Sequence, residues 1–324
     1  MPEPLRLGLL STARINRRIL PAAAASDLVE VAAVGSRTPE RAEAYAREHG
    51  IPVARGSYEA LLADSSIDAV YVPLPNSLHV EWSRRALEAG KHVLCEKPLT
   101  ERSAEAETLF HLAGGHGLVL AEAFMYRHNP QTRRLAELVR DGAIGRLGLV
   151  RTSFSFAVEG AANIRLDSEL GGGSLGDLGC YCVSGARLLA GEPASAFGRA
   201  VVGPTGVDDL FTGSLSFPGG VHALFDCGLR LPFRATLEAV GTDGALFVDD
   251  PWLCRRPGIE LRRGESVERI GVEAADSYRL ELDDFARAVA GESEPLLGRA
   301  DAVAQARVLG ALRRSAQDGA AVSL

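Results

Sequence analysis

The sequence predicts an α/β protein in which a doubly wound parallel sheet is followed by a second domain with a mostly antiparallel sheet. Up to about residue 122, short apolar runs alternate with amphipathic stretches, which is the pattern of βαβ units on a parallel sheet. After residue 123, strand-like segments follow one another through short, glycine-containing connections, which favours antiparallel pairing. We therefore expect domains at 1–122 and 123–324.

The first domain is expected to contain alternating strands and helices. Its strands are predicted at Leu5–Leu10, Val29–Val34, Ala69–Val72, His92–Cys95 and Leu118–Ala121. Its helices are predicted at Ile15–Ala25, Pro39–Glu48, Leu78–Ala89 and Ala104–Leu112. Right-handed crossovers between parallel strands then produce a doubly wound layer sandwich.

The second domain is expected to combine a run of strands with helices. The strands are predicted at Gly145–Phe156, Phe197–Val202, Leu210–Phe217, Val221–Gly228, Arg234–Gly241 and Ala245–Val248. The helices are predicted at Pro130–Arg140, about Asp177–Ala190, Tyr278–Ala290 and Arg299–Ser315.

Composition excludes several classes of protein. With 46% hydrophobic and 24% charged residues, the 324-residue chain is typical of a globular enzyme. Its net charge of -7 disfavours nucleic acid as a partner. No apolar run approaches the roughly 20 residues of a membrane span, and the N-terminus lacks the pattern of a secretory signal. The five cysteines lack paired spacing, so we expect no metal site and buried free thiols in a reducing cytoplasm.

The turn after the first predicted strand is a candidate nucleotide site. Parallel sheets bind nucleotides at the carboxyl ends of their strands, and the glycine motif expected there has Ser11, Ala13 and Asn16 in place of its glycines. An ordinary strand-to-helix turn is therefore a strong alternative. Small residues still allow backbone N–H groups to hold a pyrophosphate, and two hydroxyls add donors. The candidate cofactor-binding residues are Ser11, Thr12, Ala13, Arg14 and Ile15.

The end of the second strand indicates which nicotinamide cofactor is used. NAD sites place a carboxylate there to bind the ribose diol, whereas this chain has Ser36 and Arg37. Arg37 is suited to grip a 2′-phosphate, Ser36 to donate to it, and Arg41 lies one helical turn beyond. The alternative is a solvated surface arginine. The pattern favours NADP over NAD.

Two further strand ends contain candidate site residues. The stiff loop after the third strand would lie against the nicotinamide half of a cofactor, with Leu74, Asn76 and His79 as candidates; a simple connection is the alternative. The fourth strand ends in Glu96 and Lys97. An ammonium near a substrate oxygen stabilises developing alkoxide charge and helps to transfer a proton. Glu96 would contact the nicotinamide ribose or orient Lys97.

Three segments together resemble the Gfo/Idh/MocA oxidoreductase family across essentially the whole chain. Glu96-Lys97-Pro98 is similar to the family's E-K-P signature, Pro75–His79 to its P-N-x-x-H loop, and Gly171–Tyr181 to its G-G-G-x-x-x-D-x-G-x-H segment. The resemblance implies a Rossmann domain followed by an α/β domain whose open sheet commonly mediates homodimers or homotetramers. It also implies that Lys97 and the third segment flank the nicotinamide.

One departure from the family pattern concerns the candidate acid/base. Tyr181 stands where the family usually has histidine. Together with Ala121–Arg127, this looks like the branch of NADP-dependent xylose dehydrogenases, dimeric dihydrodiol dehydrogenases and nucleotide-sugar 3-ketoreductases. As a hypothesis, Tyr181 is the general acid/base, and Lys97 is either its electrostatic partner, favouring tyrosinate, or itself the proton donor. The alternative is a core tyrosine bonded to backbone.

Other residues near the third segment are candidates for holding the substrate. Asp177 precedes Tyr181 by four residues, so it would hold substrate hydroxyls or tune Lys97, with helix capping as the alternative. Asn163 and Arg165 would bind substrate oxygens. The alternative, which the sequence pattern supports nearly as well, is that both residues only belong to an ordinary loop. Tyr126 is a further candidate, with a core role as its alternative.

The leading hypothesis is an NADP-dependent sugar dehydrogenase similar to xylose 1-dehydrogenase. Two other enzymes fit the same residues: a 3-ketoreductase acting on a nucleotide-linked deoxysugar, and a trans-dihydrodiol dehydrogenase. A ligand-sensing regulator of the same fold would be expected to lose the lysine, whereas Lys97 and Tyr181 are both present.

Overall fold

The computed structural model describes residues 3–160 and 163–324 of the chain. The chain folds into two compact units. The first unit comprises Met1–Thr100, Ala104–Met125 and Tyr278–Val303, and the second comprises Glu101–Ser103, Tyr126–Ser277 and Ala304–Leu324. Each unit has its own sheet, and the two are described separately below.

The first unit contains a parallel sheet with the strand order β3-β2-β1-β4-β5-β6. Its strands are β1 (Leu5–Leu10), β2 (Val29–Gly35), β3 (Val53–Arg55), β4 (Ala69–Val72), β5 (His92–Glu96) and β6 (Leu120–Ala123). The strand order reverses between β1 and β4, and such a reversal opens a crevice at the carboxyl ends of the strands. The predicted doubly wound parallel sheet is confirmed.

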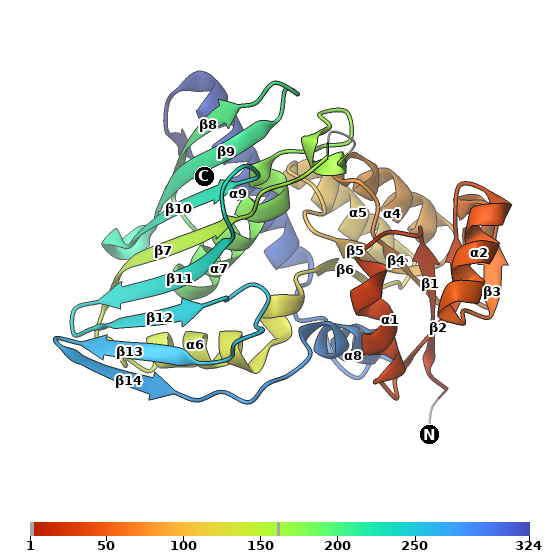
Figure 1. Ribbon diagram of the computed structural model, residues 1–324, viewed down its shortest axis with the longest axis horizontal. Helices are drawn as coiled ribbons and strands as arrows, with labels where there is room; N and C mark the ends of the chain where they lie inside the picture. The colour runs from red at the N-terminus through yellow and green to blue at the C-terminus, as the bar shows by residue number, and fades with distance from the viewer. Residues whose placement is uncertain (1–2, 161–162) are drawn as a thin grey trace. The chain divides into compact units, whose positions relative to one another are not determined.

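Helices cover both faces of this sheet (Figure 1). They are α1 (Asn16–Ala24), α2 (Pro39–His49), α3 (Tyr58–Leu62), α4 (His79–Glu88), α5 (Ser103–Gly115) and α8 (Ser277–Val289). One face packs its leucines and valines against α1, the inner side of α2, and α8, which returns from far along the sequence. On the other side, α3 packs against β1 and β2, and α4 against β4 and β5.

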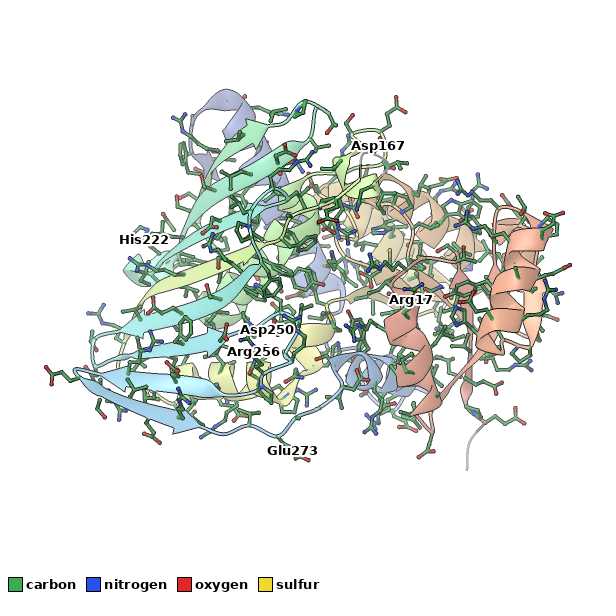
Figure 2. All side chains as sticks on the ribbon, in the orientation of Figure 1. Arg17, Asp167, His222, Asp250, Arg256 and Glu273 are labelled. Carbon is green, nitrogen blue, oxygen red and sulfur yellow. The ribbon has the colours of Figure 1, made fainter. Side chains whose placement is uncertain are left out.

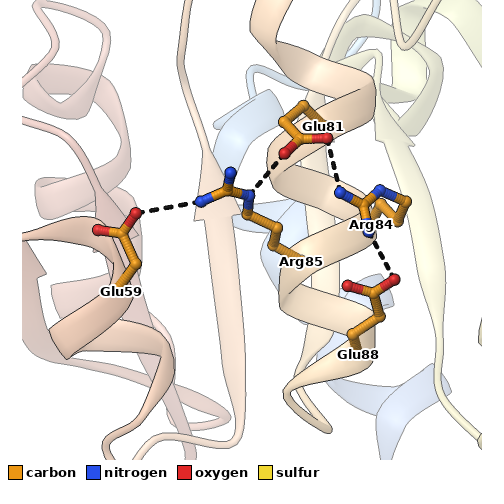
Figure 3. A network of polar contacts seen from close by, with 5 residues as sticks. All are labelled: Glu59, Glu81, Arg84, Arg85 and Glu88. Carbon is orange, nitrogen blue, oxygen red and sulfur yellow. Dashed lines mark hydrogen bonds and ion pairs between the residues drawn. The ribbon is translucent and has the colours of Figure 1, made fainter.

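The outer face of α4 shows what the abundant surface arginines do (Figure 3). Arg85 contacts Glu81 on its own helix and Glu59 on α3, while Arg84 bridges Glu81 and Glu88. These side chains are about half exposed, so the pairs contribute little to stability. The packing of the opposite face fixes the helix on the sheet.

The second unit is built on a mixed sheet with the order β14-β13-β12-β11-β7-β10-β9-β8-β15. Its strands are β7 (Leu147–Ser155), β8 (Ser195–Val202), β9 (Asp208–Ser216), β10 (His222–Gly228), β11 (Arg234–Gly241), β12 (Ala245–Asp249), β13 (Ile259–Arg263), β14 (Ser266–Ile270) and β15 (Val322–Ser323). Most neighbours are antiparallel, as predicted. The exception is β10, which inserts beside β7 in parallel after a long excursion through α7, β8 and β9.

The helices of the second unit are α6 (Pro130–Arg140), α7 (Cys180–Ala190) and most of α9 (Arg299–Asp318). α7 packs on β7 and β10, and α9 approaches β8 so closely that a Cβ on Gly198 would lie 2.9 Å from the Leu312 carbonyl. The exposed face of the sheet forms an open hollow of about 610 Å³, lined mainly by side chains such as Arg151, Asp226 and Glu238. One face of the sheet is thus covered by helices, and the other is open.

Several short elements were not predicted. β3 and α3 are too short to show a period, and every residue of β14 except the last is exposed, so it has no apolar alternation. All five cysteines lie in the described residues, and each is buried and free, as expected. Among the described residues, no helix combines the length and the apolar character needed to cross a membrane.

Candidate functional site

The turn after β1 achieves by other means what glycine usually provides. Ser11 has a φ of 154°, a conformation that side chains disfavour and that the first glycine of the motif normally supplies. Asn16, at the third glycine position, is fully buried, and its Nδ2 donates to the Ser11 carbonyl at 2.8 Å. The Ser11 hydroxyl accepts from the Ala13 N–H at 3.2 Å. The turn is therefore held by side chains rather than left to glycine.

This turn presents donors at the start of α1. Among the described residues, no acceptor meets the N–H groups of Thr12, Arg14 and Ile15, and no side chain caps the helix. Arg41 reaches back from α2 and donates from Nε to Thr12 Oγ1 at 3.0 Å. An open hollow of about 670 Å³ adjoins the turn, with Arg14, Arg17 and Arg41 in its lining. Arg17 is labelled on α1 in Figure 2. The start of α1 is thus an electropositive surface.

The end of β2 places Ser36 and Arg37 next to that surface. Ser36 is buried, whereas Arg37 is exposed. Burial raises the pKa of Tyr58, and the positive charges of Arg37 and Arg41 partly offset this rise. The positive charges of Arg37 and Arg41 therefore both lie near the Tyr58 ring, on the same side of the first unit.

The loop after β4 is fixed from inside by His79. A short 3₁₀ turn, η1 (Asn76–Leu78), precedes α4. The His79 ring is fully buried, with Nε2 at 2.8 Å from the Leu74 carbonyl and Nδ1 at 2.8 Å from the Pro98 carbonyl. Burial lowers the pKa of His79 to about 4, although the two carbonyls favour the charged ring. His79 thus ties the loop after β4 to the segment after β5.

Glu96 and Lys97 lie at the carboxyl end of β5, both half-buried. The Tyr71 hydroxyl, from the neighbouring strand β4, donates to Glu96 Oε1. Burial, and next the charge of Glu96, raise the pKa of Glu281 on α8 well above its ordinary value. The Lys97–Pro98 peptide bond is cis. The Tyr71 hydroxyl therefore holds the Glu96 carboxylate, and Lys97 follows Glu96 directly in the chain.

In the second unit, a glycine-rich turn leads into the helix with Asp177 and Tyr181. Gly171 and Gly173 have φ angles of 73° and 121°. A Cβ on Gly172 would lie 2.5 Å from the Arg165 carbonyl, so the chain approaches too closely for a side chain. The Gly173 N–H donates to that same carbonyl at 3.0 Å. The glycine-rich turn therefore packs directly on the loop that contains Arg165. Asp167, two residues further along this loop, is labelled in Figure 2.

Arg165 and Asp177 form an ion pair. Arg165 Nε donates to Asp177 Oδ2 at 2.6 Å, and the guanidinium also lies over the Phe156 ring. The Asn163 side chain accepts from the Arg165 N–H at 3.1 Å and so begins the short turn η3 (Ile164–Leu166). The structure thus brings Asn163, Arg165 and Asp177 together, and the pair has no net charge.

Tyr181 and Tyr126 belong to one aromatic cluster. Their ring centroids are 5.8 Å apart, and Tyr181 also packs edge-on against Phe154 at 5.4 Å. Trp252 contacts both tyrosines. The Tyr126 hydroxyl donates to Ser184 Oγ at 2.7 Å, so this residue is anchored within its own unit.

The predicted helix from about Asp177 to Ala190 has a different beginning. A π-helical turn, η4 (Leu175–Gly179), precedes α7. Gly179 contributes to this geometry because a Cβ there would meet Cys227 Sγ and Leu175 Cδ1 at 3.0 Å. Single π turns inside helices are frequent at functional sites because they redirect side chains.

Sequence reasoning missed the residues that support these sites. They are Asn16, Tyr71 and Glu281 in the first unit, and Asp208 and Arg313 in the second. Asn16 was noted only as a missing glycine. The sequence did contain a signal for its role. Asn16 is a polar residue at a position that usually holds glycine, and a buried polar side chain requires a hydrogen-bond partner. The others meet their partners only through the fold.

Comparison with known families places both units. Residues 5–124 match the model described as "Oxidoreductase family, NAD-binding Rossmann fold", and residues 132–247 match the "GFO/IDH/MocA C-terminal domain".

Individual relatives match almost the whole chain. D-xylose 1-dehydrogenase (NADP(+)) 2 of Haloferax volcanii is 42% identical over 99% of this chain and 100% of its own length. The trans-1,2-dihydrobenzene-1,2-diol dehydrogenase of Oryctolagus cuniculus is 38% identical over 69% of each chain. The solved structure of a 3-ketoreductase from Actinomadura kijaniata, in complex with NADP and TDP-benzene, has a TM-score of 0.90 and 35% identity over 96% of this chain and 98% of the other.

Replacing Asn16 by alanine should destabilise the first unit, because the buried Ser11 carbonyl loses its donor. We expect the free energy of unfolding to fall by about 1–3 kcal/mol. Urea denaturation measures it, with Ser77→Ala, at an exposed position of the loop after β4, as the control. Equal stability of Asn16→Ala and the control would show that the turn does not need this side chain.

Proposed function

Since this chain belongs to the Gfo/Idh/MocA oxidoreductase family, we propose that it transfers a hydride between NADP and a hydroxyl- or carbonyl-bearing carbon of a sugar. The observation that carries this proposal is the position of Lys97 beside Glu96 at the carboxyl end of β5. Ionisable side chains at this edge of a doubly wound sheet lie where such folds bind their ligands.

The residues of the first unit fit NADP. Pyrophosphate groups are bound by unoccupied N–H groups at a helix start, which Thr12, Arg14 and Ile15 provide. No carboxylate stands at positions 36 and 37 to repel a 2′-phosphate, and Ser36, Arg37 and Arg41 are suited to bind it. In this proposal His79 and Leu74 shape the loop beside the nicotinamide, Asn76 contacts the cofactor, and Glu96 contacts its ribose.

Bound NADPH supplies the hydride, and the chain's own residues manage the proton. We assign Tyr181 Oη as the donor to the substrate oxygen in reduction and as its acceptor in oxidation. The Lys97 ammonium stabilises negative charge on that oxygen and favours the phenolate, and it is the alternative donor. Asn163, Arg165 and Asp177 hold and orient the substrate, whereas the buried Tyr126 fits its alternative role in the core, packed against Tyr181. In this division 1–122 binds the cofactor and 123–324 the substrate.

We infer that the second unit accepts a free sugar. The Arg165–Asp177 pair is neutral as a whole, and it offers donors and an acceptor to hydroxyl groups. A diphosphate would instead call for uncompensated cations. This observation favours a sugar dehydrogenase similar to the Haloferax volcanii relative.

Similar proteins support two other substrates as alternatives to a free sugar. Reduction of a nucleotide-linked 3-ketosugar is favoured by the likeness to the 3-ketoreductase structure, which has a TM-score of 0.90. Oxidation of a trans-dihydrodiol is supported by the Oryctolagus cuniculus relative.

We also propose a homodimer or homotetramer in the cytoplasm. The open face of the second sheet would pair with another copy, and exposed side chains such as Leu224 lie on it. Five buried free thiols fit a reducing compartment.

Lys97→Ala should lower kcat by about 100- to 10,000-fold, because a positioned group in acid–base chemistry contributes that much. The affinity for NADPH should stay within about threefold, since backbone and arginine groups dominate its binding. The measurements are NADPH consumption or formation at saturating substrate, and fluorescence titration of NADPH.

The chain supplies a matched control for this variant. Lys91 is its other lysine, at the opposite end of β5, where Nζ donates to the backbone carbonyls of Asp64 and Ile67. Lys91→Ala should lose stability but retain kcat per folded molecule. Unchanged kcat in Lys97→Ala would refute the catalytic assignment.

Arg37→Ala should weaken NADP binding about 10- to 100-fold, because about 1.5–3 kcal/mol of charge-assisted hydrogen bonding to the 2′-phosphate is lost. NAD binding should change less than threefold, since NAD lacks that phosphate. Titration of both cofactors tests this, with the exposed Arg47→Ala on α2 as the control. An equal loss for both cofactors would contradict the specificity role.

A panel of substrates tests the sugar assignment. We expect NADP-linked oxidation of free aldoses such as xylose to exceed oxidation of trans-dihydrodiols and reduction of TDP-linked 3-ketosugars in kcat/KM. Preference for the TDP-linked ketosugar would replace the leading function by the ketoreductase, and preference for the dihydrodiol would replace it by that dehydrogenase.

A further inference from the structure

The helical segment that bears Asp177 and Tyr181 begins without a cap of its own. Ser174 precedes the π turn but has helical angles and makes no capping bond with its side chain to the turn's N–H groups. The residues before it are glycines, which offer no side chain to hold the turn. The orientation of this helix start must therefore be fixed from elsewhere in the second unit.

Asp208, the first residue of β9, supplies the missing cap. Its Oδ2 accepts from the Leu175 N–H at 2.7 Å and from Ser174 Oγ at 2.9 Å. A Cβ on Gly173 would lie only 2.3 Å from Asp208 Oδ1, so the carboxylate is pressed against the turn. A negative charge at a helix start is also favoured by the helix dipole.

A carboxylate in this position needs a counter-charge. The Asp208 side chain is 1% exposed, and a buried charge is costly unless it is paired. Arg313, near the C-terminal end of α9, donates from Nη1 to Asp208 Oδ1 at 2.7 Å. Burial would lower the pKa of Arg313, but its bonds to Glu101 and Asp208 outweigh this and raise it. The guanidinium therefore stays charged.

The same guanidinium grips a second segment. Arg313 Nε and Nη2 bind the two carboxylate oxygens of Glu101 at 2.9 and 2.5 Å. Glu101 opens the stretch of the second unit that follows Thr100, and it stands four residues after Lys97 in the sequence. One side chain thus connects the chain just after the lysine motif with the start of the helix of Asp177 and Tyr181.

We propose that Arg313 is a positioning residue, which acts through Asp208 to set the orientation of the helix start bearing Asp177 and Tyr181, and through Glu101 to hold the chain that follows Lys97. The kinetic part of this proposal rests on the proposed function, because it takes Tyr181 and Lys97 as the proton-handling groups. The structural part does not, since it concerns only the order of residues 171–181.

The test compares Arg313→Met with Arg299→Met at the other end of α9, where Arg299 forms an exposed pair with Glu107. Per folded molecule, Arg313→Met should lower kcat about 10- to 100-fold, as a misplacement of about 1 Å does. KM and NADPH affinity should stay within about threefold, and the isotope effect with an aldose deuterated at the carbon that is oxidised should rise as hydride transfer becomes limiting. Arg299→Met should match the wild type.

Hydrogen exchange gives a readout that needs no activity. The Leu175 amide should exchange at least about tenfold faster in Arg313→Met, because Asp208 loses the partner that holds it. Amides in the first unit's sheet should be unaffected. If wild-type protein turns over no substrate on the panel, the proposed function fails while this exchange result still decides the structural part.

A second variant guards against misfolding of the first. Asp208→Asn keeps the shape and an acceptor oxygen but removes the charge that Arg313 binds, so it should fold and show the same two changes more weakly. Wild-type kcat, isotope effect and Leu175 exchange in both variants would overturn the proposal. Lower stability with an unchanged kcat per folded molecule would also overturn it, because it would show a purely structural ion pair.

Discussion

The first N–H groups of a helix have no acceptors within that helix, and the two candidate sites depend on how this chain meets that constraint. At the start of α1 the N–H groups of Thr12, Arg14 and Ile15 remain available to a ligand. At the start of the Leu175–Gly179 turn, the carboxylate of Asp208 occupies the equivalent place. The first arrangement leaves donors for an anion, whereas in the second a carboxylate of the chain itself accepts from the helix start.

The missing glycines of the first turn show the difference between a motif and the requirement behind it. The backbone must take a positive φ after β1, and Ser11 takes it at some cost in strain. The bond from Asn16 to the Ser11 carbonyl offsets that cost inside the fold. The sequence motif alone favours an ordinary connection here, whereas the geometry and charge of the turn make it a candidate phosphate site.

Strong apolar periodicity made most of the fold predictable. β1, β4, β11 and α6 begin and end at the predicted residues, because β1 and β4 are continuous buried apolar runs and the burial of β11 and α6 follows a clear period. β14 and the parallel insertion of β10 beside β7 were missed, since exposure removes the period and pairing order is not a local property. The same reason hid Arg313: its bond to Asp208 spans 105 positions, and neither residue belongs to a recognisable motif.

The replacement of the family's usual histidine by Tyr181 changes what the site must provide. A free imidazole exchanges its proton near neutral pH, but a phenol has an ordinary pKa near 10. Tyr181 packs against Phe154, Tyr126 and Trp252, so its ring lies among other aromatic rings. A neutral phenol can donate a proton, but it accepts one only as the phenolate, which a nearby cation favours, and Lys97 is the residue proposed to supply that charge. Under that proposal turnover depends on the orientation of the helix start that bears Tyr181, which Arg313 is proposed to set through Asp208.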